Sequence, residues 1–407
     1  MRKNLFTALL PLLLVSCTAV GPNYRAPTTE ELHVPARWNA QTAKSGATSS
    51  SADLAAWWRQ LEDPLLSAFI EQALRDSPNV RLAQARLREA RARRDLASAN
   101  RFPTVIASAS GSRTRSSRET GSGGTHSLYD AGFDASWEPD VFGGVRRGLE
   151  AAEGDLAASQ SDLHATQVSL AAEIALNYVE VRSFQARIGI AQANLATQSE
   201  TLQLTQWRAE AGLTSVLDVE QARTNVEQTR AQIPTLESSL AEAQHRLAIL
   251  LGMAPGALTP SLKPPGSIPA VPLQLDIGIP ADTLRQRPDL RAAERRLAAE
   301  TARIGQQTAA RYPNFSLNGS LGVQALTVGA LTSGAAITHQ IAAGIAATVV
   351  DAGRIRQQIE IQSAIQEQAL RSYESAVLTA LEDVENALVA LATTTQRGTA
   401  LASAVAS

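Results

Sequence analysis

Side chains that commonly catalyse reactions or bind metals are few in this chain of 407 residues, and they are not grouped. The histidines lack the short spacings that bring metal ligands together; they are His33, His126, His164, His245 and His339. The glycine-rich stretches 121–124 and 143–144 lack the Lys-Ser/Thr pair of a phosphate-binding loop. The sequence therefore predicts no enzyme and no cofactor or metal site, and we interpret these glycines as a flexible loop and a turn.

The single cysteine, Cys17, is informative through its position. Residues 1–3 are Met-Arg-Lys, residues 5–15 are apolar but too few to span a bilayer, and small residues precede the thiol. This pattern resembles a bacterial lipobox, in which the cysteine is acylated and becomes the first residue of the mature chain. We therefore predict lipid attachment at Cys17, with Thr18 favouring the outer membrane; an ordinary signal peptide with a chance cysteine is the alternative.

Composition limits the partners and the fold class. Charge is nearly balanced, with 37 Lys and Arg against 39 Asp and Glu, and only 4% of residues are aromatic. No basic stripe marks a nucleic-acid surface, so nucleic acid is not expected as a partner. Segments rich in Ala, Gln and Leu suit long helices packed side by side. No stretch after the leader supplies ~18 consecutive apolar residues, so any part that spans a membrane must do so with strands.

The chain contains one long unit twice. A helical stretch opens at Pro78 and again at Pro288, and it ends before Pro103 and again before Pro313, so both pairs of prolines stand 210 residues apart (288 − 78 and 313 − 103). A shift kept over this distance indicates a tandem duplication. We expect the following segments: a lipoprotein signal peptide at 1–16, a lipid anchor, tether and linker at 17–76, the first repeat at 77–253, a Pro-rich connector at 254–286 and the second repeat at 287–407.

Each repeat contains two stretches in which apolar and polar residues alternate, the period of a β-strand. The strands are expected at about 103–111, 128–139, 313–324 and 337–350. In the second of them Phe133 is assigned to the apolar side and Asp134 to the polar side. Apolar side chains toward lipid and polar ones toward water are typical of a membrane barrel. A half-buried strand of a β-sandwich is the alternative.

Long helices follow the strands. No strong breaker occurs between Gly144 and Gly212, so this helix spans ~65 residues, or about 100 Å. The returning helix keeps apolar or small residues at alternating spacings of three and four from Val219 to Leu250. Such seven-residue periods predict coiled-coil packing.

Four strands are too few to close a membrane barrel, because single-chain barrels use ~8 or more. An open sheet edge in lipid leaves backbone groups unpaired at a cost of several kcal/mol each. The sequence therefore predicts an oligomer. The expected fold is mainly α with a membrane β part, in which three copies form a 12-stranded β-barrel on an α-helical barrel.

Several motifs resemble those of TolC-like outer-membrane efflux channels. They are Leu284-Arg285-Gln286-Arg287-Pro288-Asp289-Leu290-Arg291-Ala292-Ala293-Glu294, Ala248-Ile249-Leu250-Leu251-Gly252, Ala211-Gly212-Leu213 with Leu217-Asp218-Val219, and Cys17 with Gly21-Pro22-Asn23-Tyr24. Together they are similar to the OprM-like lipoprotein branch that serves RND pumps. The resemblance implies a lipid-anchored homotrimer in the outer membrane with a periplasmic helical extension. It also implies docking to a periplasmic adaptor protein and an inner-membrane RND pump, and passive export of small molecules.

Two other functions fit parts of the pattern. An outer-membrane conduit for type I protein secretion has the same architecture, so the cargo stays open. A lipid-anchored coiled-coil spacer without a pore explains the helices but not the amphipathic strands.

In TolC-like channels the turn between the two long helices forms the periplasmic aperture. The matching positions are Leu217 and Asp218. Our hypothesis is that Asp218, repeated around a trimer, constricts the entrance and attracts cations. The alternative is that this carboxylate only caps the helix N-terminus.

The duplication also predicts where the second repeat ends. The first returning helix ends near Gly252, so its counterpart is expected near residue 462 (252 + 210), about 55 residues beyond Ser407 (462 − 407). The second returning helix and aperture turn are thus expected to be missing. The sequence predicts a fragment or truncated product of a channel that forms no sealed conduit unless this helix is supplied.

Overall fold

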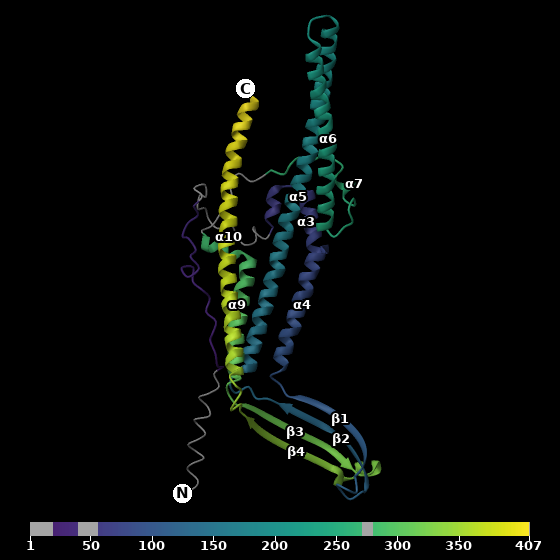
Figure 1. Ribbon diagram of the computed structural model, residues 1–407, viewed down its shortest axis with the longest axis vertical. Coiled ribbons are helices and arrows are strands. Elements are labelled where there is room, and N and C mark those ends of the chain that lie inside the picture. The colour runs from purple at the N-terminus through teal and green to yellow at the C-terminus, as the bar shows by residue number, and fades with distance from the viewer. Residues whose placement is uncertain (1–18, 40–55, 271–279, 407) are drawn as a thin grey trace. The chain divides into compact units, whose positions relative to one another are not determined.

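The computed structural model describes residues 19–39, 56–270 and 280–406 (Figure 1). Cys17 and the expected signal peptide 1–16 lie outside these ranges. The helices are α3 (Pro64–Asp76), α4 (Pro78–Ala99), α5 (Gly144–Glu210), α6 (Val216–Leu250), α7 (Thr259–Leu262), α8 (Pro280–Gln286), α9 (Pro288–Ala309) and α10 (Arg354–Ala406). The strands are β1 (Thr104–Arg115), β2 (Thr125–Trp137), β3 (Asn314–Ala325) and β4 (Ile337–Ala346). Short 3-10 turns occur at η2 (Trp57–Leu61), η3 (Val328–Thr332) and η4 (Gly334–Ala336).

The elements repeat with the spacing seen in the sequence. The helices α4 and α9 begin 210 residues apart (288 − 78), and so do the strands β1 and β3 (314 − 104) and the long helices α5 and α10 (354 − 144). The predicted fold class, mainly helical with a duplicated unit of long helices and two strands, is confirmed. The repeat boundaries at 77–253 and 287–407 stay a prediction. Helices also occur in the expected linker (α3) and in the expected connector (α7 and α8).

The chain divides into two compact units, and each draws on both repeats. The first comprises Met1–Val34, Leu87–Gln160 and Asp289–Glu382. The second comprises Pro35–Arg86, Ser161–Pro288 and Asp383–Ser407. The sheet lies wholly in the first unit, whereas the turn between α5 and α6 lies in the second.

The first unit contains one antiparallel sheet in the order β1-β2-β3-β4. The central pair, β2 and β3, joins the two repeats, and β1 and β4 form the edges. Prolines limit the strands, because proline has no N–H to donate to a neighbouring strand. Thus β4 ends at Ala346, opposite Asn314, where Pro313 precedes β3; it is shorter than the stretch expected at 337–350. At the other end β1 continues four residues past the expected Gly111.

The register gives the sheet one apolar and one polar face. Phe133 stands opposite Ala107 on one side and Leu321 on the other, so all three share a face. The apolar face consists mainly of Val105, Ala107, Ala109, Tyr129, Ala131, Phe133, Ala135, Trp137, Phe315, Leu317, Leu321, Val323, Ile337, Ile341, Ala343 and Ile345. Most of its large side chains are exposed in the single chain, whereas Tyr129, Phe315 and Val323 are half-buried.

The opposite face carries hydroxyl, amide and carboxylate groups. The Ser110 hydroxyl donates to Asp130 Oδ1 at 2.6 Å, and the Ser108 hydroxyl donates to Asp134 Oδ2 at 3.3 Å. Phe133 and Asp134 therefore lie on opposite faces, as the alternation predicts.

Helices of the first unit pack through small residues. A Cβ on Gly154 of α5 would stand 2.9 Å from the Cβ of Ala299 in α9, so these helices approach closely. Beside this contact Arg303 bonds to both Asp155 and Glu300. Gln362 of α10 donates to the other oxygen of Glu300 at 2.7 Å, which ties α9 to α10 (Figure 1).

In the second unit, α6 buries the apolar and small residues that the sequence places on one face between Val219 and Leu250. Along α6 the positions with alternating spacings of three and four are buried or half-buried, while most residues between them are exposed. The core of this unit is centred on Leu66, Ile70, Ile174, Tyr178, Leu247 and Leu262. Within 19–39, 56–270 and 280–406, no helix combines the length and the apolar character needed to cross a membrane.

Candidate functional site

Two places in the structure gather polar groups in a defined geometry, and the first is the turn between α5 and α6. Gly212 ends α5 with a left-handed φ of 75°. Its N–H donates to Ala209 O at 2.9 Å, and the N–H of Leu213 donates to Arg208 O at 2.8 Å, the bonding pattern of a Schellman cap. A Cβ on Gly212 would meet open space, so the backbone conformation alone requires glycine here.

Asp218 forms a capping box at the start of α6. The Ser215 hydroxyl accepts from Asp218 N at 3.2 Å, and Asp218 Oδ2 accepts from Ser215 N at 2.9 Å. The same oxygen accepts from Thr214 Oγ1 at 2.6 Å and from Ser215 Oγ at 2.7 Å. The carboxylate therefore fixes the entry into α6 as well as carrying a charge.

Hydrogen bonds from Thr214, and then from the side chain and backbone of Ser215, lower the pKa of Asp218 to about 2. All three favour the charged form of the carboxyl. Asp218 is also exposed, so at neutral pH the turn presents a solvated negative charge. The sequence pattern Ser215-x-x-Asp218 is a capping-box signal that could have identified Ser215 beforehand.

Exposed aliphatic residues stand close to Asp218 in the sequence of this turn. Leu213, Val216 and Leu217 are each more than 70% exposed. The structure thus places Leu217 and Asp218 together in the first turn of α6, with Leu217 facing solvent. Exposed apolar side chains grouped around a fixed carboxylate are typical of a surface that meets another protein chain.

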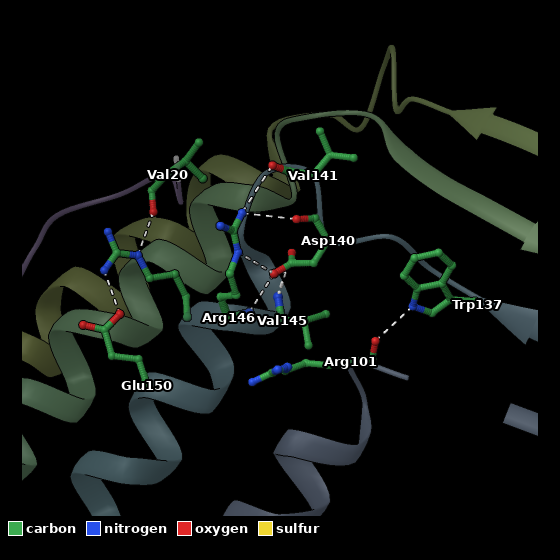
Figure 2. A network of polar contacts seen from close by, with 9 residues as sticks. Val20, Arg101, Trp137, Asp140, Val141, Val145, Arg146 and Glu150 are labelled. Atoms are coloured by element: carbon green, nitrogen blue, oxygen red, sulfur yellow. Dashed lines mark hydrogen bonds and ion pairs between the residues drawn. The ribbon is translucent and has the colours of Figure 1, made fainter. Parts of the chain in front are cut away.

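The second place is the junction between β2 and α5, in the first unit (Figure 2). Asp140 caps α5, because its carboxylate accepts from Val145 N at 3.1 Å and from Arg146 N at 2.8 Å. The Arg146 guanidinium returns to the same carboxylate at 3.2 Å. At the end of β2 the Trp137 indole donates to Arg101 O at 3.0 Å. These contacts hold the strand ends against the helix ends.

The N-terminal segment 19–24, which we call the strap, lies against this junction. Val20 N donates to Phe142 O at 3.1 Å. Gly21 has a φ of 90°, and a Cβ there would stand 2.3 Å from the Cα of Gly305 in α9. The strap therefore crosses α9 at a distance that only glycine permits.

Arg147 holds the strap from the α5 side. Its side chain is only 5% exposed and donates from Nε to Val20 O at 3.1 Å and from Nη2 to Gly21 O at 3.3 Å. Further bonds reach Asn23 Oδ1 at 2.7 Å and Glu150 Oε2 at 2.7 Å, and Figure 2 shows both Val20 and Glu150 near this end of α5. A planar guanidinium suits this task because its donors point in several fixed directions.

Tyr24 attaches the strap to α9 of the second repeat. Its hydroxyl donates to Glu294 Oε1 of α9 at 3.2 Å. Burial, together with the nearby Glu294 carboxylate, raises the pKa of Tyr24 well above its usual value. The sequence suggested only an extended tether here; the strap instead ties α5 of the first repeat to α9 of the second.

A cavity of about 840 Å³ opens beside the junction. Asp155 and Arg303 line it, as do Phe142 and Tyr312, whose rings stack with centroids 4.7 Å apart. Burial raises the pKa of Asp155, although the Arg303 charge opposes the shift. In the part of the chain that the structure describes, no three His, Cys, Asp or Glu side chains are grouped so that they could hold a metal ion.

Comparison with known proteins gives consistent results. The family model described as outer membrane efflux protein matches residues 69–253 and 279–407. Nodulation protein T of Rhizobium leguminosarum bv. trifolii is 31% identical over 397 residues, which cover 96% of this chain and 82% of the relative. The antibiotic efflux pump outer membrane protein ArpC of Pseudomonas putida is 32% identical over 399 residues, covering 96% and 81%. The solved outer-membrane channel OprN aligns with a TM-score of 0.88 at 38% identity, over 95% of this chain and 85% of that chain.

Proposed function

This chain belongs to the outer membrane efflux protein family, and we propose that three copies of it form a passive conduit for small molecules from the periplasm to the exterior. Membership makes the chain an outer-membrane channel protein whose long helices extend into the periplasm. Its relatives are channel proteins rather than enzymes. The observation that carries the proposal is the two-faced sheet with an unpaired strand at each edge.

Closing the sheet requires further copies of the chain. In lipid the free backbone groups of β1 and β4 would each cost several kcal/mol. Pairing β1 of one copy with β4 of the next satisfies them, and a ring of three copies then has twelve strands. The apolar face with Phe133 turns to lipid, and the polar face with Asp130 and Asp134 turns to the water-filled interior.

The turn between α5 and α6 forms the periplasmic entrance in this proposal. Three copies of Asp218 place three ionised carboxylates around one axis, with Leu217 beside each of them. The exposed aliphatic side chains there suit docking of a periplasmic adaptor protein, which in turn connects the conduit to an inner-membrane RND pump. The relative named as part of an antibiotic efflux pump supports this assignment. The interior face of the sheet offers small and polar side chains, so selection of cargo belongs to the pump.

Planar-bilayer recordings test the conduit and its entrance together. The purified protein, supplied with a matching second returning helix, is expected to conduct ions, and Asp218→Ala in that protein is expected to raise the conductance and weaken block by divalent or trivalent cations. Asp218→Asn, which keeps an acceptor for Ser215 and Thr214 while removing the charge, separates the gate from the cap. Glu227→Gln, at an exposed carboxylate further along α6, is the matched control.

Acidification provides an independent check on the same recordings. The folded-state pKa of Asp218 is depressed to about 2, below its unfolded value of ~3.9. In the folded protein the carboxyl therefore stays charged down to about pH 2. Cation block and the capping contribution should therefore persist at pH 4 and disappear as the pH falls through about 2. Absence of any conductance would favour the spacer, and cation block unchanged in Asp218→Asn would remove Asp218 from the gate.

Lipid attachment at Cys17 is part of the same proposal. The lipobox pattern places the acylated residue two positions before the strap, which begins at Ala19. Cys17→Ala is expected to abolish labelling by radioactive palmitate and to leave uncleaved or soluble precursor. A normal mature N-terminus and unchanged membrane fractionation in this variant would contradict the assignment.

A further inference from the structure

The first hairpin carries a pair of arginines at an unusual place. Beyond Gly111, β1 continues as Ser112-Arg113-Thr114-Arg115. The register between β1 and β2 is unbroken from Thr104 to Arg115, so Arg113 and Arg115 share a face with Ala107, Gly111 and Phe133. Both cations thus stand on the apolar face, whereas the polar face of the same stretch carries the neutral Ser112 and Thr114.

The aromatic residues of β2 indicate the depth of this pair. Trp137 and Tyr129 lie eight residues apart (137 − 129) on the apolar face, with Phe133 midway. At ~3.4 Å per residue and a tilt of about 40°, they bracket a band of roughly 21 Å. Transmembrane barrels carry an apolar band of ~25 Å between aromatic girdles. Trp137 and Tyr129 therefore mark the two edges of the membrane core.

Arg113 and Arg115 lie just outside the far edge. Arg113 is six residues from Ala107, the partner of Phe133 (113 − 107). This places it about 16 Å from the level of Phe133 along the membrane normal, beyond the half-thickness of ~12 Å. The hairpin ends on the side of the sheet away from the helices of its own unit (Figure 1). Because those helices are periplasmic, the arginines reach the headgroup level of the outer leaflet.

Within the described residues, neither Arg113 nor Arg115 forms an ion pair, and both are exposed. Their strand partners, Ser127 and Thr125, are small and uncharged. The hairpin loop adds Arg118 and one carboxylate, Glu119, which leaves the tip with a net positive charge. Asp130 faces the other side of the sheet, where Ser110 donates to it. The opposite hairpin tip, residues 326–338, contains no charged residue.

We propose that Arg113 and Arg115 bind the phosphate groups of anionic lipid in the outer leaflet. Guanidinium groups bind phosphate oxygens in a bidentate way, and at headgroup level the arginine stems lie along the apolar band. The occupant is lipid rather than exported cargo, because the pair stands on the face directed away from the interior. Pairing of β1 with a neighbouring β4 occurs in the plane of the sheet and leaves this face accessible. The inference rests on the membrane position of the sheet proposed above.

Native mass spectrometry of the detergent-solubilised full chain, with a bisphosphorylated glucosamine lipid (lipid A) as probe, tests this. Each arginine near an anionic headgroup increases the affinity for the lipid by less than about tenfold. The double variant with Arg113→Gln and Arg115→Gln should therefore retain less lipid than the parent, by a factor on the order of tenfold to thirtyfold. A swapped variant carries Ser112→Arg, Arg113→Ser, Thr114→Arg and Arg115→Thr. It keeps the composition and net charge but moves both cations to the interior face, and it should lose the lipid as well.

Several outcomes would overturn the proposal. These are equal retention by the parent, double and swapped proteins, equal retention of the phosphate-free lipid, or displacement of the lipid by millimolar inorganic phosphate. Heat-resistant trimer on gels confirms that each variant is folded. Conductance measured on the same preparations separates the two proposals, because loss of lipid binding with normal conductance leaves the conduit intact. Conductance absent from every protein, while the parent retains the lipid and the double and swapped variants lose it, rejects the conduit alone.

Discussion

Phe133→Lys is expected to destabilise the membrane-inserted sheet by ~2–4 kcal/mol, the cost of a lysine on the lipid face near the bilayer midplane. Asp134→Asn, one residue further along β2, is expected to change stability by no more than about 0.5 kcal/mol. The asparagine faces water and can still accept from Ser108. Successive residues of a strand point to opposite faces, so adjacent substitutions meet opposite environments. Urea-dependent unfolding in lipid vesicles, together with the yield of trimer, measures both effects.

Neighbouring strands supply matched controls for this comparison. Leu321 stands opposite Phe133, and Ser320 stands opposite Asp134. Leu321→Lys should therefore behave like Phe133→Lys, and Ser320→Lys should be tolerated. Similar losses in all four variants would show that the apolar face does not meet lipid.

Arg147→Ala is expected to release the strap and to reduce the free energy of unfolding by ~2–4 kcal/mol. The buried guanidinium donates to the carbonyls of Val20 and Gly21 and to the Asn23 side chain. Without it these acceptors lose charged donors, and the aliphatic stem leaves a gap beside Gly305. Chemical denaturation measures the loss, and faster tryptic cleavage at Arg25 reports release of the strap.

The adjacent Arg146 provides the control. Its side chain is 41% exposed and bonds to Asp140, so Arg146→Ala should cost less than about 1 kcal/mol and leave cleavage at Arg25 slow. Arg147→Lys should not restore the parent stability. A single ammonium group cannot bond at once to the Val20 and Gly21 carbonyls and to the Asn23 side chain, as the planar guanidinium does. Stability restored by lysine, or unchanged cleavage in Arg147→Ala, would contradict the role assigned to Arg147.

Local patterns predicted much of the fold. The spacing from Val219 to Leu250 identified the buried stripe of α6, because the helical period alone decides which residues share a face. The prolines identified the starts of α4 and α9. The strand end at Arg115 could not be predicted in this way, since Ser112-Arg113-Thr114-Arg115 has no apolar alternation and is a strand only through pairing with β2. The end of β4 depends on Pro313, which precedes β3 and is distant from the end of β4 in the sequence.

Some site residues could also be predicted from local patterns, and others could not. Leu217 and Asp218 were assigned to the aperture by resemblance, and this role stays a prediction; the capping box that Asp218 forms lies within four consecutive residues. Arg147 was missed because Val20 lies 127 residues from it in the sequence, so no local pattern connects them. The only sequence signal was Gly305, a glycine within an otherwise alanine-rich helix, which indicates a close backbone approach.

Pairing of β2 with β3 has an evolutionary consequence. Within one chain it joins the second strand of one repeat to the first strand of the next, which is the same kind of junction that β4 and β1 of neighbouring copies must form. An ancestor of half the length, with a single hairpin, can therefore close an equivalent ring as six identical copies. Gene fusion then relaxed the requirement that all six hairpins be alike. In this chain one tip carries arginines and the other carries no charged residue, so in a ring of three copies two kinds of surface alternate along the outer rim.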